Sequence, residues 1–297
     1  MKGIFWGVAT AAVLAQACNA SKQVATSPGA ENEAAQVRPE EQTQPGHDNL
    51  NAVLWMQSSA EYAALAHQAY TTGQLALDEA IEDPTWTASV EQQAAGGYED
   101  LPPAVVLDLD ETVLDNSAYQ ARLVKSGETY NSDTWRAWTE EAAARVTPGA
   151  TVYLREVANR GVEVVYITNR RSGEEEATRR NLAALGLPLS AEGDHVLTRG
   201  ERAEWSDSDK TLRREAVAQQ YRIIQLVGDN LGDFVEAKGS LTARAEVIDR
   251  YRDYWGMRWI VIPNPSYGSW ESALFGDDYS KSPAQRRAEK LKALRSE

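Results

Sequence analysis

Three short apolar runs stand out along the chain, and each ends abruptly in polar residues. The runs are Ala104–Leu107, Val164–Ile167 and Ile223–Val227. Near-continuous apolar runs of this length predict strands that are buried on both faces, as in a parallel sheet. Because a bare carboxylate is costly to bury, the acids after the first run should lie where the strand leaves the core. In open α/β sheets, that edge is where ligands bind.

The segments around these runs carry apolar residues at helical spacing. Helices are predicted within residues 50–81, 174–186 and 210–220, and a further strand at 258–262. This alternation predicts an α/β fold with a parallel sheet and right-handed crossovers. Residues 115–147 interrupt the alternation with a polar, Trp-containing stretch. We interpret that stretch as an insertion above the carboxyl ends of the strands.

Changes in composition predict the domain boundaries. Residues 19–47 are rich in Ala, Ser, Pro, Gln and Glu, which cannot form a core and favour a flexible tether. Lys281–Glu297 has a charged helical pattern that is typical of a solvated surface helix. The predicted parts are a signal peptide (1–17), a tether (18–47), a folded domain (48–279, with a helical cap from about 48–100 and 115–147 and an α/β core from about 101–114 and 148–279) and a charged C-terminal helix or tail (280–297).

The N-terminus resembles a secretory signal. Met1-Lys2 precedes a short apolar segment, 3–14, that is too short to span a membrane. Two processing routes remain open. Cys18 is the chain's single cysteine and stands where a bacterial lipoprotein would be lipidated, whereas Ala15-Gln16-Ala17 also suits ordinary signal peptidase. The first route predicts an outer-membrane lipoprotein of the cell envelope, and the second a soluble periplasmic or secreted protein.

The charge of the chain limits its partners. A formal net charge of −14 at pH 7 argues against nucleic acid as a partner, because like charges repel. A phosphate-binding pocket in such a chain needs local positive charge from a metal ion, a lysine or helix N-termini.

The polar residues after the three runs supply candidate chemistry. Asp108 and Asp110 are two residues apart and point the same way from an extended chain. Because the carboxyl ends of parallel strands share one edge, we expect the other polar ends to join them there. The candidate residues at this edge are Asp108, Asp110, Thr168, Asn169, Lys210, Asp229 and Asp233.

The order of these motifs carries a family resemblance. Asp-x-Asp-x-Thr, a strand-end Thr, a Lys and Gly-Asp-x-x-x-Asp resemble the motif set of the haloacid dehalogenase-like (HAD) phosphatases. Residues 108–117 and 167–170, with Asn181-Leu182 and Gly186, resemble the two-part signature of class C nonspecific acid phosphatases, the bacterial lipoprotein e family. Residues 263–268 are also similar to that family, and the resemblance covers roughly residues 48–275. It implies a Rossmann-like parallel sheet flanked by helices, with a smaller helical cap.

The resemblance implies a role for each acid. Asp108 would be the nucleophile that forms an aspartyl-phosphate, and Asp110 would protonate the leaving group and later activate water. Asp108, the main-chain carbonyl of Asp110 and Asp229 would bind Mg²⁺. Asp233 and Asn230 would support these ligands from the second layer of the site.

The resemblance also implies how substrate is held. Thr168, together with nearby backbone N–H groups and Asn169, would bind the phosphoryl oxygens, and Lys210 would act as a point charge on the nucleophile and phosphate. Trp135 and Tyr267 match positions that flank the leaving group, where an aromatic ring could stack. Ordinary packing of these two rings is the alternative.

The implied function is a secreted, Mg²⁺-dependent acid phosphatase, anchored to the membrane through Cys18. Its small phosphomonoester substrates would be aromatic phosphates, 5′-nucleotides and nicotinamide mononucleotide, and the family also implies a homodimer. An alternative is a non-catalytic surface lipoprotein that uses the same fold for binding or adhesion, although such a protein would be expected to lose some of the acids. Phosphotransfer to an alcohol uses the same intermediate, and the sequence does not separate it from hydrolysis.

Overall fold

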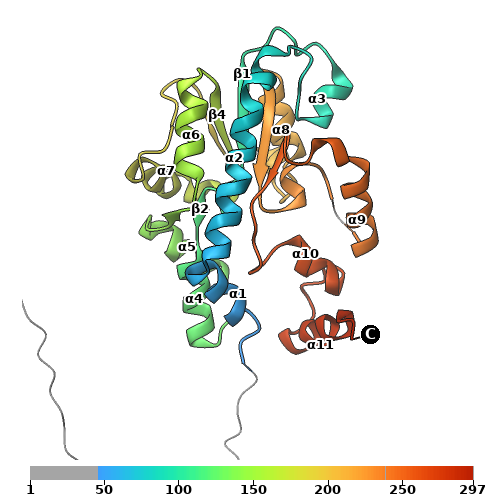
Figure 1. Ribbon diagram of the computed structural model, residues 1–297. Coiled ribbons are helices and arrows are strands. Elements are labelled where there is room, and N and C mark those ends of the chain that lie inside the picture. The colour runs from blue at the N-terminus through green and yellow to red at the C-terminus, as the bar shows by residue number, and fades with distance from the viewer. Residues whose placement is uncertain (1–45, 238, 297) are drawn as a thin grey trace, which may run out of the picture. The chain divides into compact units, whose positions relative to one another are not determined.

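A parallel sheet of five strands, in the order β5-β4-β1-β6-β7, lies at the centre of the residues described by the computed structural model, 46–237 and 239–296. The chain passes from β1 to β4 and β5 on one side and then returns to β6 and β7 on the other, so β1 lies where the order reverses (Figure 1). The carboxyl ends of β1, β4 and β6 are therefore neighbours, as the sequence predicts. The strands are β1 (Pro103–Leu107), β4 (Glu163–Arg171), β5 (Val196–Arg199), β6 (Arg222–Gly228) and β7 (Trp259–Val261).

Helices surround this sheet, and short 3₁₀ turns and a small antiparallel pair of strands connect them. The α-helices are α1 (Leu50–Ser58), α2 (Ala60–Glu82), α3 (Val90–Ala95), α4 (Ser117–Ser126), α5 (Ser132–Glu141), α6 (Ala150–Asn159), α7 (Glu175–Ala184), α8 (Thr211–Ala218), α9 (Leu241–Arg250), α10 (Ser269–Ser272) and α11 (Pro283–Ala293). The small pair is β2 (Leu114–Asp115) with β3 (Arg145–Val146), and the 3₁₀ turns are Ser172–Glu174, Ala203–Trp205, Leu231–Asp233, Arg252–Tyr254 and Ala273–Phe275.

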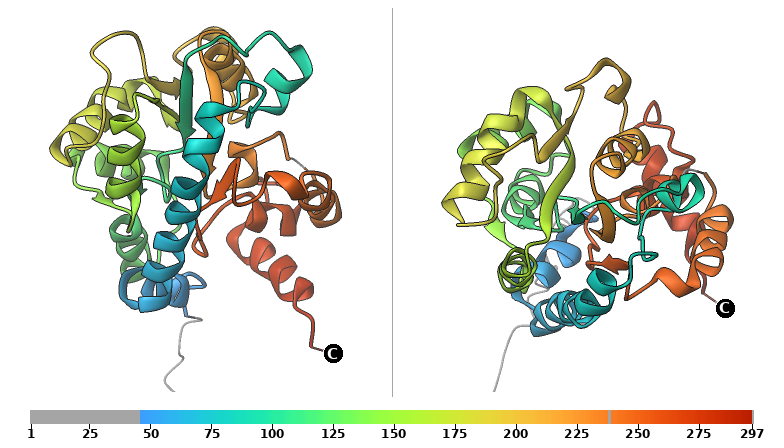
Figure 2. Two further views of the ribbon diagram at one scale, coloured as in Figure 1. Left: turned by 45° about the horizontal axis from the view of Figure 1, so that its top comes forward. Right: turned by 90° about the horizontal axis from the view of Figure 1, so that it is seen from above.

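Hydrophobic cores fill both faces of the sheet. Successive residues of β1 point to opposite faces, so Val105 packs with Tyr70 of α2, whereas Val106 packs with Val217 of α8. Figure 2 shows helices on both sides of the strands. This burial on both faces explains why the sequence shows the strands as continuous apolar runs rather than as alternating patterns.

Helix α2, which lies in the predicted cap, packs against the sheet. It contacts α6, β6 and β7, and Tyr70 and Leu77 on one of its faces are buried in the core. Residues 60–82 therefore pack on the α/β layers, and the extent of the predicted cap (about 48–100 and 115–147) stays a prediction. The apolar positions of this helix recur at helical spacing, which fits a helix lying on a sheet equally well.

The insertion at 115–147 lies beyond the carboxyl end of β1, as expected. It contains α4 and α5, and the β2–β3 pair closes its base (Figure 1). Helix α1 contacts α4, so this short helix adjoins the insertion.

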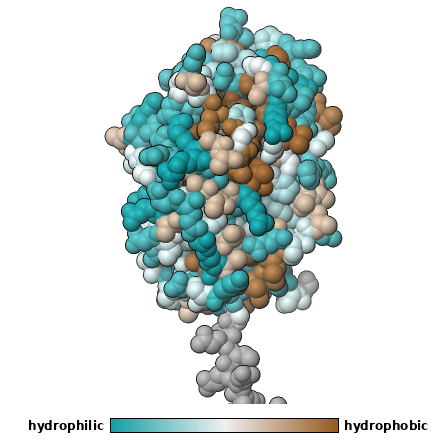
Figure 3. Space-filling model, turned by 90° about the vertical axis from the view of Figure 1, so that its left-hand side faces the viewer, coloured by the Kyte–Doolittle hydropathy of each residue, from teal (hydrophilic) through white to brown (hydrophobic). Residues whose placement is uncertain are grey.

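The side of the folded unit that faces the viewer in Figure 3 is largely hydrophilic, with a hydrophobic area in its upper part.

Other expectations about the ends of the chain have different outcomes. The predicted C-terminal helix is present as α11. The signal peptide, nearly all of the tether and the lipidation site at Cys18 lie outside the described residues, and remain predictions. In the described part of the chain, no helix combines the length and apolar character that crossing a membrane requires.

Candidate active site

Three carboxylates meet at the edge formed by β1 and β6. Asp108 follows β1, Asp229 follows β6, and Asp233 ends the 3₁₀ turn after β6. Each of the three offers an oxygen, and these oxygens lie within 4.8 Å of one another. The three acids that the sequence places at one edge therefore lie close together, and their shared role in catalysis stays a prediction.

Gly228 and Asn230 bring Asp233 back toward the strand. The backbone N–H of Asn230 donates to Asp233 Oδ2 at 2.9 Å, and the backbone N–H of Asp233 bonds the carbonyl of Asn230. A Cβ on Gly228 would lie 2.3 Å from Asp233 Oδ2, so only glycine allows this approach. The Asp-x-x-x-Asp spacing therefore forms a tight turn that Asn230 caps, and a role of Asn230 in supporting a bound metal stays a prediction.

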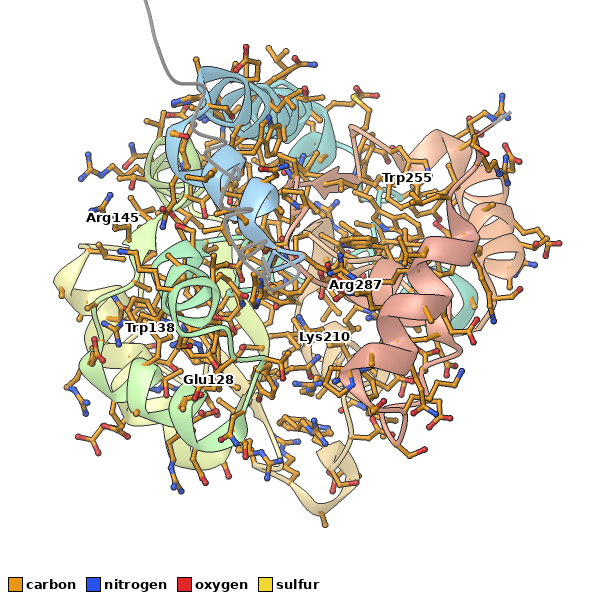
Figure 4. The ribbon with its side chains drawn as sticks, turned by 90° about the horizontal axis from the view of Figure 1, so that it is seen from below. Glu128, Trp138, Arg145, Lys210, Trp255 and Arg287 are labelled. Carbon is orange, nitrogen blue, oxygen red and sulfur yellow. The ribbon has the colours of Figure 1, made fainter. Side chains whose placement is uncertain are left out.

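Lys210 is the cation of the cluster. It stands at the N-cap of α8, its side chain is 4% exposed, and its Nζ donates to Asp108 Oδ1 and, at 2.7 Å, to Asp233 Oδ1. Of the nearby arginines, Arg213 donates to the Thr168 carbonyl, and Arg214 donates to Glu91 and to the Asp233 main-chain carbonyl. Seen from below, Lys210 lies between the segment carrying Glu128 and Trp138 and the helix carrying Arg287 (Figure 4).

The electrostatics of the cluster favour a bound cation. Burial, opposed by Lys210, raises the pKa of Asp108 from 3.8 to about 7, and burial also raises the pKa of Asp229 well above its usual range. Burial works against the charge of Lys210, but Asp108 and Asp233 together raise its pKa. Three carboxylates against one ammonium leave an excess of negative charge, and oxygen-only donors suit a hard divalent ion.

Asp110 lies apart from this cluster and has its own partners. Arg170 Nη2 donates to Asp110 Oδ1 at 2.8 Å, and Asn116 Nδ2 donates to the same oxygen at 2.9 Å. Asn116 is fully buried, and its Oδ1 accepts from the indole N–H of Trp138 at 2.8 Å. The sequence pattern alone predicts no role for Arg170 or Asn116, although both lie in the motifs that carry the resemblance.

Thr168 and Asn169 lie on β4 beside this pair. Thr168 is buried, and its Oγ1 accepts from the backbone N–H of Arg170 at 3.1 Å. Arg213 donates to the Thr168 carbonyl at 2.5 Å and to Asn169 Oδ1 at 2.7 Å, while Asn169 Nδ2 donates to the Ser208 carbonyl at 3.1 Å. The Asn169 amide therefore links the end of β4 to α8 and the segment before it, and its contact with substrate stays a prediction.

The turn after Asp110 is held by contacts from distant segments. Glu111 is buried with a φ of 62°, a conformation that is uncommon for residues other than glycine. Its carboxylate accepts from the backbone N–H of Asn116 at 2.8 Å and from the hydroxyl of Tyr267. The hydroxyl of Tyr70 on α2 donates to the Thr112 carbonyl at 2.8 Å.

The two predicted aromatic residues, Trp135 and Tyr267, come from segments that are far apart in the sequence. Trp135 of α5 lies 5.6 Å from the Arg170 guanidinium, and Tyr267 contacts Glu111. Both rings are partly exposed. The sequence analysis missed Asn264, whose Nδ2 donates to Asp229 Oδ2 at 2.7 Å. Asn264 belongs to the same loop as Tyr267, so this loop contacts both the acid cluster and the turn after Asp110.

Comparisons with known proteins agree with this geometry. Residues 9–270 match the family described as HAD superfamily, subfamily IIIB (acid phosphatase). Two structures of the class C acid phosphatase from Bacillus anthracis resemble the fold. The first is 37% identical, with a TM-score of 0.73, and the match covers 84% of this chain and 97% of that one. The second, with tungstate bound, is 36% identical, has a TM-score of 0.72 and covers the same shares.

A more distant match is vegetative storage protein 1 from Arabidopsis thaliana. It is 27% identical over 136 residues, which make up 44% of this chain and 48% of the relative. The chain thus spans about half the length of this curated relative. The family is shown by the match over residues 9–270 and by the similarity to the Bacillus anthracis structures. The chain belongs to the acid phosphatases of subfamily IIIB of the HAD superfamily, and among them it groups with class C.

Proposed function

We propose that this protein is a metal-dependent phosphomonoesterase that works through a covalent aspartyl-phosphate on Asp108. The observation that carries the proposal is the cluster of Asp108, Asp229 and Asp233 around Lys210 at the carboxyl edge of β1 and β6. A protein that used the same fold only for binding would have no need to keep this complete set of buried, mutually repelling charges.

Asp108 supplies the nucleophilic oxygen. Attack on the phosphorus forms the Asp108–phosphate bond and breaks the ester bond to the leaving alcohol, which splits one difficult displacement into two easier ones. Lys210 contacts the Asp108 carboxylate directly and keeps a positive charge beside the nucleophile. Thr168 and adjacent backbone N–H groups receive the phosphoryl oxygens, with Asn169 beside them.

Mg²⁺ fits the donor set, because Asp108, Asp229 and the main-chain carbonyl of Asp110 offer only oxygen ligands. When bound, it would neutralise charge on the phosphate and the surrounding acids. The side chain of Asn264 donates a hydrogen bond to Asp229, and the backbone N–H of Asn230 donates one to Asp233. Both acids are therefore oriented by hydrogen bonds of their own.

Asp110 is the acid and base of the proposal. In the first step it gives a proton to the leaving oxygen, and in the second it takes a proton from the water that releases phosphate from Asp108. Microscopic reversibility assigns both transfers to one group.

The proposed substrates are aromatic phosphates, 5′-nucleotides and nicotinamide mononucleotide, as the family resemblance implies. Trp135 and Tyr267 support this choice, because they are partly exposed aromatic residues next to the Asp110 network on which an aromatic leaving group could stack. Tungstate, present in one structure of the Bacillus anthracis relative, is a tetrahedral oxyanion like phosphate.

The direct test compares the wild-type protein with Asp108→Asn in hydrolysis of p-nitrophenyl phosphate. We expect the variant to lose nearly all turnover while its circular dichroism spectrum is unchanged, and EDTA to silence the wild type until Mg²⁺ is restored. A variant that keeps most of its activity contradicts the nucleophile, and hydrolysis that resists chelation contradicts the metal. Product analysis with an added alcohol acceptor separates hydrolysis from phosphotransfer.

We also propose that the mature protein is attached to the outer membrane through a lipid on Cys18 and that it forms a homodimer. The support is the N-terminal sequence for the anchor and the family resemblance for the dimer. Mass spectrometry of the mature N-terminus tests the anchor. An unmodified Cys18, or a mature chain that begins after Cys18, contradicts it. Light scattering of the purified protein tests the second, for which a monomeric mass is the contrary result.

A further inference from the structure

Arg170 is a deeply buried cation that no step of the proposed reaction uses. It lies on β4 two residues after Thr168, and both side chains are buried. Its side chain is 1% exposed, and its ion-pair partner is Asp110, whose side chain is 17% exposed. A guanidinium is costly to bury unless its donors are satisfied, so the contacts that satisfy it show what it holds in place.

These contacts converge on one oxygen of Asp110. Arg170 Nε and Nη2 donate to Asp110 Oδ1 at 3.0 and 2.8 Å, and Asn116 Nδ2 donates to the same atom at 2.9 Å. The other oxygen, Oδ2, has only a longer contact of 3.3 Å to Arg170 Nε. Oδ1 is thus saturated as an acceptor, whereas Oδ2 remains available to a further partner.

The guanidinium itself is fixed from its remaining sides. Nη1 donates to Thr178 Oγ1 on α7 at 3.1 Å, and Nη2 lies 3.4 Å from Asn116 Oδ1. The ring of Trp135 lies 5.6 Å from the guanidinium carbon, within the range of a cation–π contact. The fork that binds Asp110 is therefore held by β4, α7 and the insertion together.

We propose that Arg170 is a positioning residue that turns the Asp110 carboxyl group so that Oδ2 is the atom that exchanges the proton with the leaving group. This inference rests on the proposed role of Asp110 as acid and base. As Asp108 forms its bond to phosphorus and the ester bond breaks, the proton passes from Oδ2 to the leaving oxygen. When water later attacks the phosphorus, Oδ2 takes up one proton from that water, and Asp108 and phosphate are released.

The proposal predicts a dependence on the leaving group. A poor leaving group needs the proton in the transition state, whereas a good one departs without it, so a misplaced acid harms only the poor ones. The measurement is kcat/KM for a series of substituted phenyl phosphates of similar shape, from dinitrophenyl to unsubstituted phenyl phosphate. For Arg170→Met, we expect a loss of about 100-fold with phenyl phosphate, the lower limit for a general acid, and little loss with dinitrophenyl phosphate.

Matched variants separate this role from structural damage. Arg170→Lys keeps the charge but loses the two-pronged contact, so it should show the same dependence. Arg213→Met removes another buried arginine of the same edge, one that holds Thr168 and Asn169, and its loss should be equal across the series. Thr178→Val withdraws one support of Arg170 and should give a smaller dependence of the same sign, which keeps the test available if Arg170→Met does not fold.

Asp110→Asn separates the inference from the function on which it rests. A steep leaving-group dependence in Asp110→Asn, matched by Arg170→Met and not deepened in the double variant, supports both. A steep dependence in Asp110→Asn with a uniform loss in Arg170→Met and Thr178→Val overturns the positioning role alone. A uniform loss in Asp110→Asn overturns the acid itself, and the positioning role with it.

Discussion

At the scale of single residues, the site depends on close approaches that leave no space for a larger side chain. Gly228 is the clearest case, because Asp233 folds back over it to receive the backbone N–H of Asn230 and the ammonium of Lys210. A methyl group at Gly228 would overlap both Asp233 Oδ2 and Asp233 Cβ, at 2.3 and 2.4 Å. The position of one acid in the cluster is thus set by the absence of a side chain five residues earlier.

Gly228→Ala should therefore weaken metal binding. We expect activity to fall by 10-fold or more at limiting Mg²⁺ and to recover partly at high Mg²⁺, because second-layer changes of this kind cost about 10–100-fold in metal affinity. Gly232→Ala is the matched control, since a Cβ there meets nothing within 4 Å. Equal Mg²⁺ titrations for the two variants would contradict this account of the turn.

The sequence predicts some contacts of single residues in the site and not others. Asp108 and Asp229 could be placed together because each follows a strand that ends at the same edge, and Lys210 because it opens the helix that leads to β6. Asn264 could not, because its contact with Asp229 depends on how the loop after β7 folds back, and no local pattern encodes that. Arg170 was visible in the sequence, but its partner Asp110 lies sixty residues away.

At the scale of elements, α2 supports the catalytic turn from the face of the sheet. Its Tyr70 lies in the core beside Val105 and Leu107 of β1, and the phenol reaches the Thr112 carbonyl at 2.8 Å. The turn between β1 and β2 contains the strained Glu111, so it needs such external contacts to hold one conformation. A helix that the sequence assigned to a cap is thus part of the support of the site.

Tyr70→Phe should reduce both stability and turnover. Loss of the phenol leaves a buried carbonyl without its partner, at a cost of about 1–3 kcal/mol in the free energy of unfolding, and loosens the turn that carries Asp110. Tyr153→Phe is the control, because its hydroxyl donates to Gln225 Oε1 in the same core, away from the turn. The measurements are denaturant unfolding and kcat for each variant. We expect both variants to lose a similar amount of stability and only Tyr70→Phe to lose turnover.

Should Tyr153→Phe reduce kcat as much as Tyr70→Phe, α2 would contribute only to general stability and would have no specific effect on the turn.

Two elements are not predicted from the sequence, and both have a physical explanation. β5 has only four residues, and α9 has Arg244 as its one buried residue, so neither produces a strong apolar pattern.

At the scale of the whole folded unit, burial of the acids makes the stability of the protein depend on pH, and a bound cation would offset the cost of their charge. Asp108 has a pKa of about 7 in the folded protein and an ordinary, lower value in the unfolded chain. The folded state therefore binds more protons than the unfolded state between about pH 4 and pH 7, and stability without metal falls as pH rises through this range. Burial raises the pKa of Asp229 in the same direction.

Mg²⁺ should therefore stabilise the protein more at pH 7.5 than at pH 5, because protons compete for the same oxygens at the lower pH. The measurement is the shift in Tm on adding Mg²⁺ to EDTA-treated protein at the two pH values. Asp108→Asn should show a smaller shift at pH 7.5 than the wild type. A shift that is the same at both pH values, or larger at pH 5, would count against a metal site built on these acids.

The central claim is that Asp108 itself carries the phosphoryl group during turnover. Rapid acid quench of the Mg²⁺-loaded protein with p-nitrophenyl phosphate, followed by peptide mass spectrometry, tests it most directly. We predict a phosphoryl adduct on Asp108 that hydroxylamine removes, as expected of an acyl phosphate, and that is absent from Asp108→Asn. An adduct on another residue, or turnover without an adduct on Asp108 when breakdown of the intermediate is slowed by Asp110→Asn, would contradict the account.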